Sequence, residues 1–505
     1  MKRVAIIGGG VAGLSAGIYA QMCGLESVIY EQHTIAGGEL TGWERGGCHI
    51  DNCVHWMTGT SPDSELYNVW REVGALTGAA GETVQNEAFL KVDTADGTTL
   101  SLWQNLDRLH DDMVAVSPED RTLIDKFIKE VKAYRCVELP SKFPAERMPL
   151  KETWRLVMKM KGVAKVHKRC RTISIGDYAA QFKSDAIRKM LTAYFPPQYN
   201  VSSLMYVLAI FSNGNAALPR GGSLAMARRM EERYRSLGGK VCAGHKAVKI
   251  EVEGRRARRV LFANGKTAEA DCVVCACDTA VTFRDLIGRE RMDKVFRLWY
   301  GFKYKYPVHS SVNLYFDVAD GCGMLPDTSL FECEPYIVAG RRHDTILVKN
   351  FNGEPSFVPE GHTVIQTLHL QYAGEYEFWS RLRLSDIAAY RKEKERVAGE
   401  VMRRIEAKYP ELAGKMRLVE AVTPASFNRY CGAYKGSYMS FILTPYVPKI
   451  IHRGVLKGLD NLYLAGQWLQ PPGGLPNAVL TGKFAIQRLC RREHIPFVGY
   501  GVTWK

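Results

Sequence analysis

The feature that most constrains the fold is a glycine-rich turn near the N-terminus. Residues 3–8 are a short apolar run rich in β-branched side chains, and Gly8-x-Gly10-x-x-Gly13 leads from it into a helical pattern over 14–23. In such a strand–turn–helix unit the first glycine permits the turn, the second lets the backbone approach a pyrophosphate, and the third allows close helix packing. Because free N–H groups at a helix start attract anions, the turn predicts a dinucleotide site.

A carboxylate follows at the distance that such a site requires. A second apolar strand, Ser27–Tyr30, ends in Glu31, about 20 residues beyond the turn, where a carboxylate accepts hydrogen bonds from ribose hydroxyls. A 2′-phosphate at the same place would be repelled by Glu31, which argues against NADP. NAD and FAD are the remaining dinucleotides.

A second pair of glycines favours FAD over NAD. The segment Ala36-Gly37-Gly38-Glu39-Leu40 comes directly after the ribose acid, where an NAD dehydrogenase would continue into a third strand. A glycine pair at this place suits a loop that must pass close to a long, bent cofactor. We therefore predict bound FAD.

The positive charge of the chain is concentrated in one segment. The sequence has 68 Lys and Arg against 53 Asp and Glu, a net charge of +15, and eight of the basic residues with one acid lie between Lys151 and Arg171, interleaved with apolar residues. This pattern predicts a basic, partly amphipathic helix, which would suit an anionic membrane surface. The alternative is a solvated helix whose apolar side packs on the protein. No nucleic-acid-binding motif accompanies the charge, so we expect no nucleic-acid partner.

The cysteines and the N-terminus indicate a cytoplasmic protein. Thirteen cysteines, an odd number without a disulfide framework, fit a reducing compartment, and none has the paired spacing of a metal site. The glycines of the N-terminal turn would weaken a secretory signal helix, and no run reaches the ~18 apolar residues that a membrane span needs. We expect a cytoplasmic protein that is not secreted, either free or peripheral to a membrane.

The complete set of motifs resembles one enzyme family. Four segments are similar to the flavin amine oxidase superfamily. They are the opening segment, a middle block from Pro219 to Ala276, a block with Thr423-Pro424 and Gly436-Ser437, and a terminal block from Asn461 to Ala478. Within that superfamily they are most similar to the branch of phytoene desaturase, carotenoid isomerase and retinol saturase.

The resemblance implies an α/β fold with one domain inserted into another. A Rossmann-like FAD-binding domain of the GR2 type would be assembled from residues 1–85, 215–290 and 415–505. Residues 86–214 and 291–414 would form an α+β substrate-binding domain with a mixed sheet and helices. Within it, Ser117–Asp120 predicts the start of a helix, and alternating patterns over 311–316 and 362–367 predict strands.

The resemblance also implies which residues bind FAD. They come from the turn, the ribose acid, the glycine pair, a returning strand near the adenine and the terminal block: Gly8, Gly10, Val11, Ala12, Gly13, Glu31, Gly37, Gly38, Glu39, Leu40, Val248, Gly466, Gln467, Leu475, Pro476, Asn477 and Ala478. Two of these depart from the family pattern. Many relatives carry arginine where this chain has Glu39, and amine oxidases often carry an acid where it has Gln467.

Three residues are the candidates for catalysis. In the family, the segment after Asp51 passes close to the flavin, which here delivers His55 and Trp56; Tyr434 is a further hydrogen-bond donor. His55 could act as a general acid or base near neutral pH, or it could be a hydrogen-bonded structural histidine. Trp56, with Trp43, could form the wall of an apolar pocket.

These observations predict an FAD-dependent oxidoreductase that acts on CH–CH groups. It would transfer hydride between flavin and a carbon–carbon bond of a hydrophobic isoprenoid, polyene or lipid-like substrate, as a desaturase, saturase or isomerase. No second G-x-G-x-x-G follows a strand, so electrons would pass to or from an external partner through the same cleft. Two alternatives stay open: an amine oxidase that produces hydrogen peroxide, and a non-catalytic flavoprotein that acts as an interaction partner.

Overall fold

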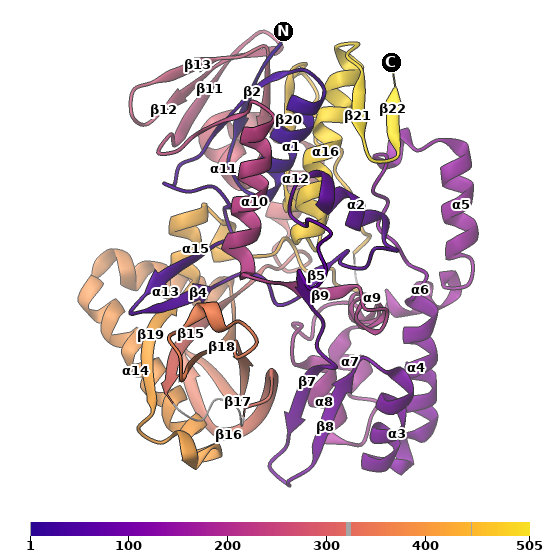
Figure 1. The fold of residues 1–505 in the computed structure, drawn as a ribbon, viewed down its shortest axis with the longest axis vertical. Helices are drawn as coiled ribbons and strands as arrows, with labels where there is room; N and C mark the ends of the chain where they lie inside the picture. The colour runs from indigo at the N-terminus through magenta and orange to yellow at the C-terminus, as the bar shows by residue number, and fades with distance from the viewer. Residues whose placement is uncertain (1, 320–324, 446, 505) are drawn as a thin grey trace.

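A five-stranded parallel sheet organises the N-terminal unit of the computed structural model, which describes residues 2–319, 325–445 and 447–504 (Figure 1). The strand order is β10–β2–β1–β14–β20. The strands, in that order, are Lys240–Cys242, Glu26–Tyr30, Arg3–Ile7, Cys272–Cys275 and Leu462–Leu464. The five strands therefore come from three separate stretches of the chain. The α/β fold class is confirmed.

The two faces of this sheet are covered by different elements. Val4 and Ile6 of β1 pack into a core formed with helices α1 (Val11–Met22), α10 (Gly222–Ser236) and α16 (Leu475–Arg492). Ala5 and Ile7 face a second core under a three-stranded antiparallel sheet. The strands of that sheet are β11 (Ala247–Glu253), β12 (Arg256–Phe262) and β13 (Thr267–Glu269). This alternation explains why β1 reads as a continuous apolar run, since both of its faces are buried.

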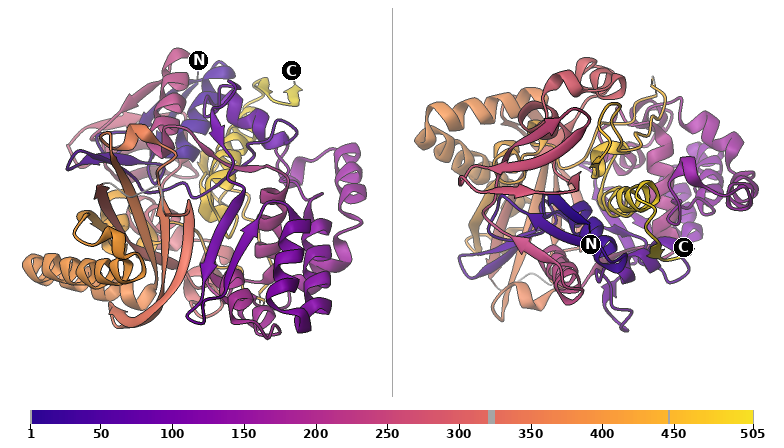
Figure 2. Two further views of the ribbon diagram at one scale, coloured as in Figure 1. Left: turned by 60° about the horizontal axis from the view of Figure 1, so that its bottom comes forward. Right: turned by 90° about the horizontal axis from the view of Figure 1, so that it is seen from above.

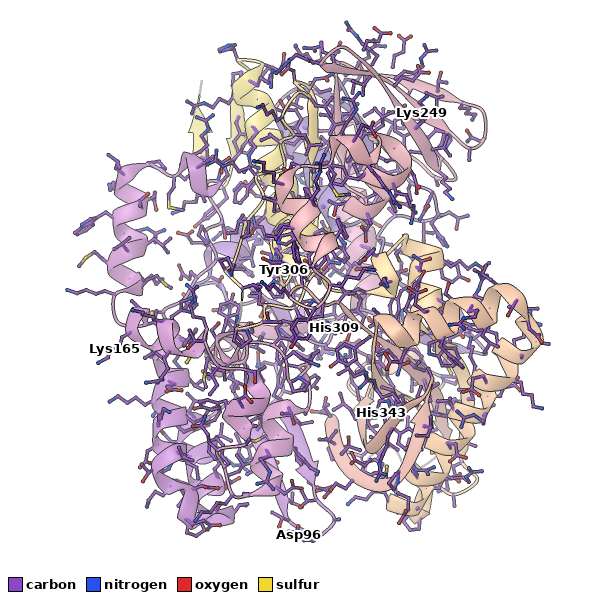
Figure 3. All side chains as sticks on the ribbon, turned by 180° about the vertical axis from the view of Figure 1, so that it is seen from behind. Asp96, Lys165, Lys249, Tyr306, His309 and His343 are labelled. Carbon is purple, nitrogen blue, oxygen red and sulfur yellow. The ribbon has the colours of Figure 1, made fainter. Side chains whose placement is uncertain are left out.

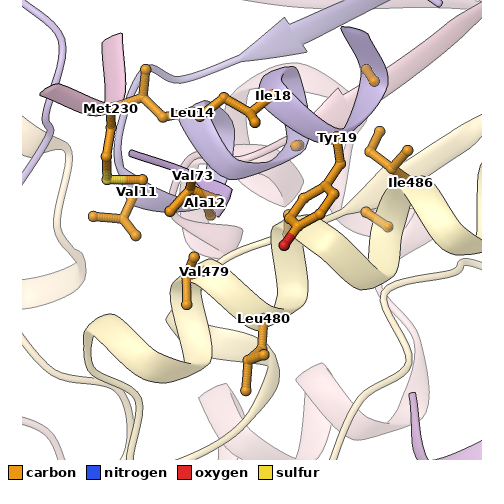
Figure 4. Close-up of a cluster of buried hydrophobic side chains, with 14 of the residues drawn as sticks. Val11, Ala12, Leu14, Ile18, Tyr19, Val73, Met230, Val479, Leu480 and Ile486 are labelled. Carbon is orange, nitrogen blue, oxygen red and sulfur yellow. The ribbon is translucent and has the colours of Figure 1, made fainter. Parts of the chain in front are cut away.

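Helices α1 and α16 pack closely against each other beside the glycine-rich turn. Figure 4 shows Val11, Ala12 and Tyr19 of α1 facing Val479 and Leu480 of α16, within one buried cluster. The Ser15 hydroxyl donates to the carbonyl of Val479 at 2.7 Å. The contact brings the N-terminal and C-terminal segments of the chain together, which places the starts of both helices at one site.

The second unit is built on a seven-stranded mixed sheet of order β19–β15–β18–β17–β16–β7–β8. The strands, in that order, are Met416–Val422, His309–Ala319, His362–Tyr372, Arg341–Asn350, Thr328–Val338, Ala88–Asp93 and Thr99–Trp103. β16 pairs with β7 in parallel, and the remaining neighbours are antiparallel. The strands predicted over 311–316 and 362–367 are parts of β15 and β18.

One predicted boundary between the two units is displaced. The sequence predicts that residues from 415 onward belong to the FAD-binding domain, but β19 pairs along β15, with Asn313 opposite Val422 and Val318 opposite Met416. β19 therefore belongs to the seven-stranded sheet, and the chain returns to the FAD-binding unit only after Val422. The sequence did not predict this, because the pattern of apolar residues in a strand is the same in either sheet.

Helices cover the seven-stranded sheet on two sides. Helices α13 (Ala373–Ser385) and α14 (Ile387–Lys408) pack on one face, where Trp379 and Val397 share a buried core with Val312 and Leu314 of β15. A helical lobe lies on the opposite side, beside β7 and β8 (Figures 1 and 2). The lobe comprises α3 (Leu106–Val116), α4 (Arg121–Tyr134), α6 (Ala164–Cys170), α7 (Ile175–Ala179), α8 (Asp185–Thr192) and α9 (Val201–Ser212).

The predicted basic helix is two helices instead of one. Helix α5 (Leu150–Met160) and helix α6 are separated by a turn at residues 161–163, and none of the α5 residues is buried. Gly162 lies in this turn and interrupts the helical pattern. Among the residues that the structure describes, no helix is long and apolar enough to cross a membrane.

Candidate functional site

A cavity of about 1860 Å³ is lined by residues of both units and of the helical lobe. Sites for one ligand of drug size usually measure about 300–1,000 Å³. The volume therefore suits a large cofactor together with a substrate. All of the residues predicted to bind FAD line this cavity except Gly13, which lies just behind the turn.

The glycine-rich turn forms one end of the cavity. Gly8 has φ +104°, and α1 begins at Val11 with no side chain of the described residues capping it, so its first N–H groups are free to bind an anion. A Cβ at Gly13 would overlap the carbonyl oxygen of Gly8, which explains why only glycine fits there. The N–H of Gly37 donates to the carbonyl of Gly9 at 2.9 Å, which places the second glycine pair beside the first turn. We call this end of the cavity, around Gly8, Gly10, Gly37 and Gly38, the cradle.

Glu31 is held rigidly at the end of β2. It is buried, lines the cavity, and accepts the N–H of Gly9 at 2.6 Å and the N–H of His33 at 2.8 Å. Each carboxylate oxygen keeps a further lone pair, so Glu31 can still accept from a ribose hydroxyl. Val248 of β11 also lines the cavity, and its contact with the adenine stays a prediction.

The two departures from the family pattern are hydrogen-bonded to each other. The amide Nε2 of Gln467 donates to Oε2 of Glu39 at 2.9 Å, and its Oε1 accepts the N–H of Gly474 at 2.8 Å. Burial raises the pKa of Glu39 to about 8, and the nearby charge of Asp278 acts in the same direction, while the hydrogen bond from Gln467 opposes it. At neutral pH Glu39 is therefore mostly a neutral carboxylic acid, which adds no negative charge to the cradle.

Asp278 is a cavity residue that sequence reasoning missed. It follows β14, is buried, and accepts the N–H groups of Ala280 and Tyr434, each at 2.7 Å. Burial raises the pKa of Asp278 to about 7, despite these hydrogen bonds. The sequence did contain a signal for this residue, because Asp278 is an acid that follows the strand Cys272–Cys275. The carboxyl ends of parallel strands border the ligand crevice.

The start of α16 closes the cradle at the terminal block. Gly474 precedes the helix with φ +87°, and no side chain of the described residues caps it, so the N–H groups of Leu475 and Asn477 are free, while Pro476 has none. The amide of Asn477 donates to the carbonyls of Gln470 and Gly473 at 3.0 and 2.7 Å, which fixes the loop that enters the helix. Gly466 is tied to this helix, because its N–H donates to the Thr481 hydroxyl at 2.9 Å. Two helix starts therefore face one cavity, an arrangement suited to an anionic, electron-accepting cofactor.

His55 lines the cavity but does not titrate near neutral pH. Burial lowers its pKa to about 3, with the charge of Lys349 acting in the same direction, and its Nδ1 atom has no hydrogen-bond partner among the described residues. His55 is therefore neutral at pH 7, and its role as a general acid or base stays a prediction. The sequence could not show this, since Lys349 comes from a strand about 300 residues away.

The two other catalytic candidates have different surroundings. Trp56 lines the cavity and packs against Phe89, Tyr194 and Phe195, with ring centroids 5.3, 5.8 and 6.1 Å away. The ring of Tyr434 packs instead between Tyr300 and Trp468, at 4.9 and 6.0 Å. Trp43 also lines the cavity. The structure thus brings Trp56 into an aromatic pocket, whereas Tyr434 is part of a separate aromatic core.

The cysteines near the site are neutral thiols. Burial raises the pKa of Cys48 and of Cys53, and Cys53 lines the cavity. A thiol whose pKa is raised is a poor nucleophile and metal ligand. No group of three or more His, Cys, Asp or Glu side chains that could hold a metal lies within residues 2–319, 325–445 and 447–504.

Strand β15 contributes a wall that sequence reasoning did not identify as part of the site. His309, Ser311 and Asn313 alternate along the strand and all line the cavity. Their signal in the sequence was the alternation of Ser311 and Asn313 with the apolar residues Val312 and Leu314.

Comparison with known proteins agrees with this geometry. Residues 11–490 match the family described as flavin containing amine oxidoreductase. The chain is 23% identical over 519 residues to the chloroplastic prolycopene isomerase of Daucus carota, covering 96% of this chain and 79% of the relative. It is 22% identical over 519 residues to the lycopene-forming phytoene desaturase of a Paracoccus species, covering 96% and 97%. A solved oxidoreductase from Methanosarcina mazei shares the fold, with a TM-score of 0.60 at 14% identity over 96% of this chain and all of that one.

Proposed function

Since the chain belongs to the flavin-containing amine oxidoreductase family, we propose that it transfers hydride between FAD and a carbon–carbon bond of a hydrophobic substrate. FAD is its cofactor, and the chain is an oxidoreductase related to carotenoid desaturases and isomerases. The observation that carries the proposal is the continuity of the cavity, which extends from the glycine cradle to an aromatic and apolar pocket.

Residues at one end of this cavity would bind the cofactor, and residues at the other end would bind the substrate. Bound FAD would supply the hydride acceptor or donor. The N–H groups at the starts of α1 and α16 would hold its charged and polar groups, and Glu31 would hold a ribose. The aromatic pocket around Trp56 would bind and orient the carbon chain and exclude water from it. An external electron donor or acceptor would complete the cycle.

A buried lysine lies near His55. Lys349 is buried behind His55 and donates to the carbonyl of Val54 at 2.7 Å. Burial lowers the pKa of Lys349 to about 8, so it still carries positive charge at neutral pH. Asp51 and Glu354 act on this pKa in the opposite direction, so the lysine has carboxylates nearby, and its charge does not by itself select between an amine and a polyene.

An anaerobic survey of flavin absorbance tests the proposed reaction. We expect a polyene to bleach the oxidised flavin, or an enone or conjugated polyene to reoxidise the dithionite-reduced flavin, and amines to do neither. Hydrogen peroxide formed from amines, with no response to polyenes, would favour an amine oxidase. A flavin that dithionite cannot reduce would favour a non-catalytic flavoprotein.

We also propose that helix α5 binds an anionic membrane surface and receives substrate from it. Leu150, Trp154 and Val157 are 89%, 67% and 59% exposed, while Leu156 and Met160 of the same helix line the cavity. Lys151, Lys161, Lys165 and Lys168 form no ion pair with any described residue. An exposed apolar face flanked by unpaired cations, on a helix that also lines the cavity, suits a lipid interface on the cytoplasmic side.

Sedimentation with lipid vesicles tests this second proposal. We expect the holoprotein to sediment with vesicles containing phosphatidylglycerol and to lose at least tenfold in affinity in the double variant Leu150→Ser, Trp154→Ser. The matched control is Leu384→Ser, because Leu384 of α13 is 78% exposed but lies in another part of the molecule. Equal loss in the control, or no binding of the wild type at low salt, would contradict the proposal.

A further inference from the structure

Strand β15 presents two chemically different faces. Val312, Leu314 and Phe316 point toward α13 and α14 and belong to the core there. The alternate residues His309, Ser311 and Asn313, which we call the polar row, line the cavity instead. Figure 3 places His309 at the centre of the molecule, where the seven-stranded sheet meets the FAD-binding unit.

Each side chain of the polar row ends in a buried atom without a partner. His309, Ser311 and Asn313 are 5%, 0% and 3% exposed, and His309 Nδ1, Ser311 Oγ and Asn313 Oδ1 have no hydrogen-bond partner among the described residues. A buried polar atom left unpaired is unfavourable, so native structures contain few of them. Three on one face of one strand, all at a cavity, indicate a polar ligand group.

The polar row is held in place by its neighbours. The Asn313 amide Nδ2 donates to Asn52 Oδ1 at 3.1 Å, and the Tyr315 hydroxyl donates to the same oxygen at 2.6 Å, which orients Asn313 with its carbonyl oxygen free. The His309 ring lies between Tyr199 and Tyr438, with centroids 5.8 and 5.3 Å away. Tyr438 lines the cavity as well; burial raises the pKa of its hydroxyl and the nearby Ser311 hydroxyl opposes this rise, although the two groups do not reach hydrogen-bonding geometry.

The chemistry of the row selects a neutral ligand group that both donates and accepts hydrogen bonds. Burial lowers the pKa of His309 to about 4, so its imidazole is neutral at pH 7, and the other two members carry no charge. Asn313 Oδ1 can only accept, so it requires a donor, while Ser311 can donate as well as accept. A hydroxyl group satisfies both needs, whereas a carbonyl or ether oxygen cannot donate to Asn313.

Resting on the proposed function, we propose that the polar row binds a hydroxyl group of the substrate. The substrate would then be a hydrophobic alcohol, anchored at β15 while its carbon chain occupies the aromatic pocket. The row belongs to the seven-stranded sheet, whereas the cradle glycines belong to the five-stranded sheet and its loops. This separation assigns the row to the substrate, with FAD held by the other unit.

Binding measurements on the holoprotein test the proposal without requiring turnover. The probes are geranylgeraniol, its methyl ether and the corresponding hydrocarbon, and the dissociation constants come from the perturbation of the flavin spectrum. We expect the alcohol to bind at least tenfold more tightly than the ether or the hydrocarbon. Equal affinity for all three probes would overturn the proposal.

Two variants of the row and one neighbour sharpen the test. Asn313→Leu and Ser311→Ala should each weaken the alcohol by about fivefold or more and leave the hydrocarbon unchanged. Ser310→Ala is the control, since Ser310 lies on the other face of β15 and donates to the carbonyl of Gly436. We expect it to lower thermal stability without changing the preference for the alcohol, whereas Ser311→Ala should leave stability unchanged or raise it.

The outcomes separate this proposal from the reaction itself. Selective binding of the alcohol by the wild type, lost in Asn313→Leu, would support the polar row even if no probe altered the redox state of the flavin. Loss of FAD from the row variants, seen as a lower ratio of flavin to protein, would overturn the proposal by assigning the row to the cofactor.

Discussion

Glu39 and Gln467 together replace two charges of the family pattern by a neutral pair. The resemblance implies an arginine and an acid at these places, and here a largely protonated carboxyl group accepts a hydrogen bond from an amide. If only one of the two positions departed from the family pattern, the Glu39 carboxyl group would lack its amide partner, or the Gln467 amide would lack its carboxyl partner. Their direct contact explains how the cradle tolerates a glutamate, because at neutral pH the glutamate carries little charge.

FAD affinity should therefore fall at alkaline pH. Because the pKa of Glu39 is raised to about 8, the carboxyl group is neutral below that pH and ionised above it. FAD phosphates would repel the ionised form, so binding above pH 8 requires uptake of one proton. We expect the dissociation constant to rise by up to about tenfold per pH unit above pH 8, measured by flavin fluorescence between pH 6.5 and 9.5.

Two variants show whether Glu39 causes this dependence. Glu39→Gln should bind FAD with nearly the same affinity across the range, because an amide does not ionise. Glu26→Gln, in an exposed residue at the start of β2, should keep the wild-type profile. An unchanged profile in Glu39→Gln would mean that another group, such as Asp278, controls the alkaline loss.

At the scale of elements, the contact between α1 and α16 sets the position of both helix starts. A Cβ at Gly482 would overlap the carbonyl oxygen of Ala12 and come within 2.9 Å of the Ser15 Cβ. Interior backbone cannot move apart without disturbing the packed cluster of Figure 4. Gly482 therefore determines how closely the C-terminal helix approaches the glycine-rich turn.

Gly482→Ala should destabilise the fold, whereas alanine at another helical glycine should not. We expect Gly482→Ala to lower the free energy of unfolding by about 1–3 kcal/mol, and to weaken FAD binding as the helix starts separate. Gly399→Ala in α14 is the matched control, since nothing lies within 4 Å of its Cβ position. There alanine should stabilise by about 0.5–1 kcal/mol. Urea unfolding of both variants decides this, and equal effects would contradict the packing argument.

At the scale of the whole molecule, the cofactor site joins distant parts of the chain. The cradle combines Gly8 near the N-terminus, Asp278 from the middle and Asn477 near the C-terminus. Since the site exists only when these segments are assembled, FAD binds the folded chain and not the unfolded one. Ligand binding then adds directly to the free energy of unfolding.

FAD should raise the thermal unfolding midpoint of the apoprotein. At a concentration one hundred times its dissociation constant, the stabilisation should be about 2.7 kcal/mol. Riboflavin lacks the adenosine and pyrophosphate groups that the glycine-rich turn and Glu31 would hold, so at the same concentration it should stabilise less. Differential scanning fluorimetry provides the comparison, and equal shifts for both ligands would show that the N-terminal cradle contributes nothing.

The sequence by itself determined the family, the α/β fold, the cofactor and nearly all of the cradle. It did so because glycines and the ribose acid act through the backbone near their own position, in a strand–turn–helix unit of about 30 residues. Only the tertiary structure decided the substrate side. The membership of β19 in the larger sheet, the burial that holds His55 neutral and the orientation of His309, Ser311 and Asn313 all depend on residues distant in sequence. Burial and charge at a site arise from whichever elements pack there, and no local pattern records that packing.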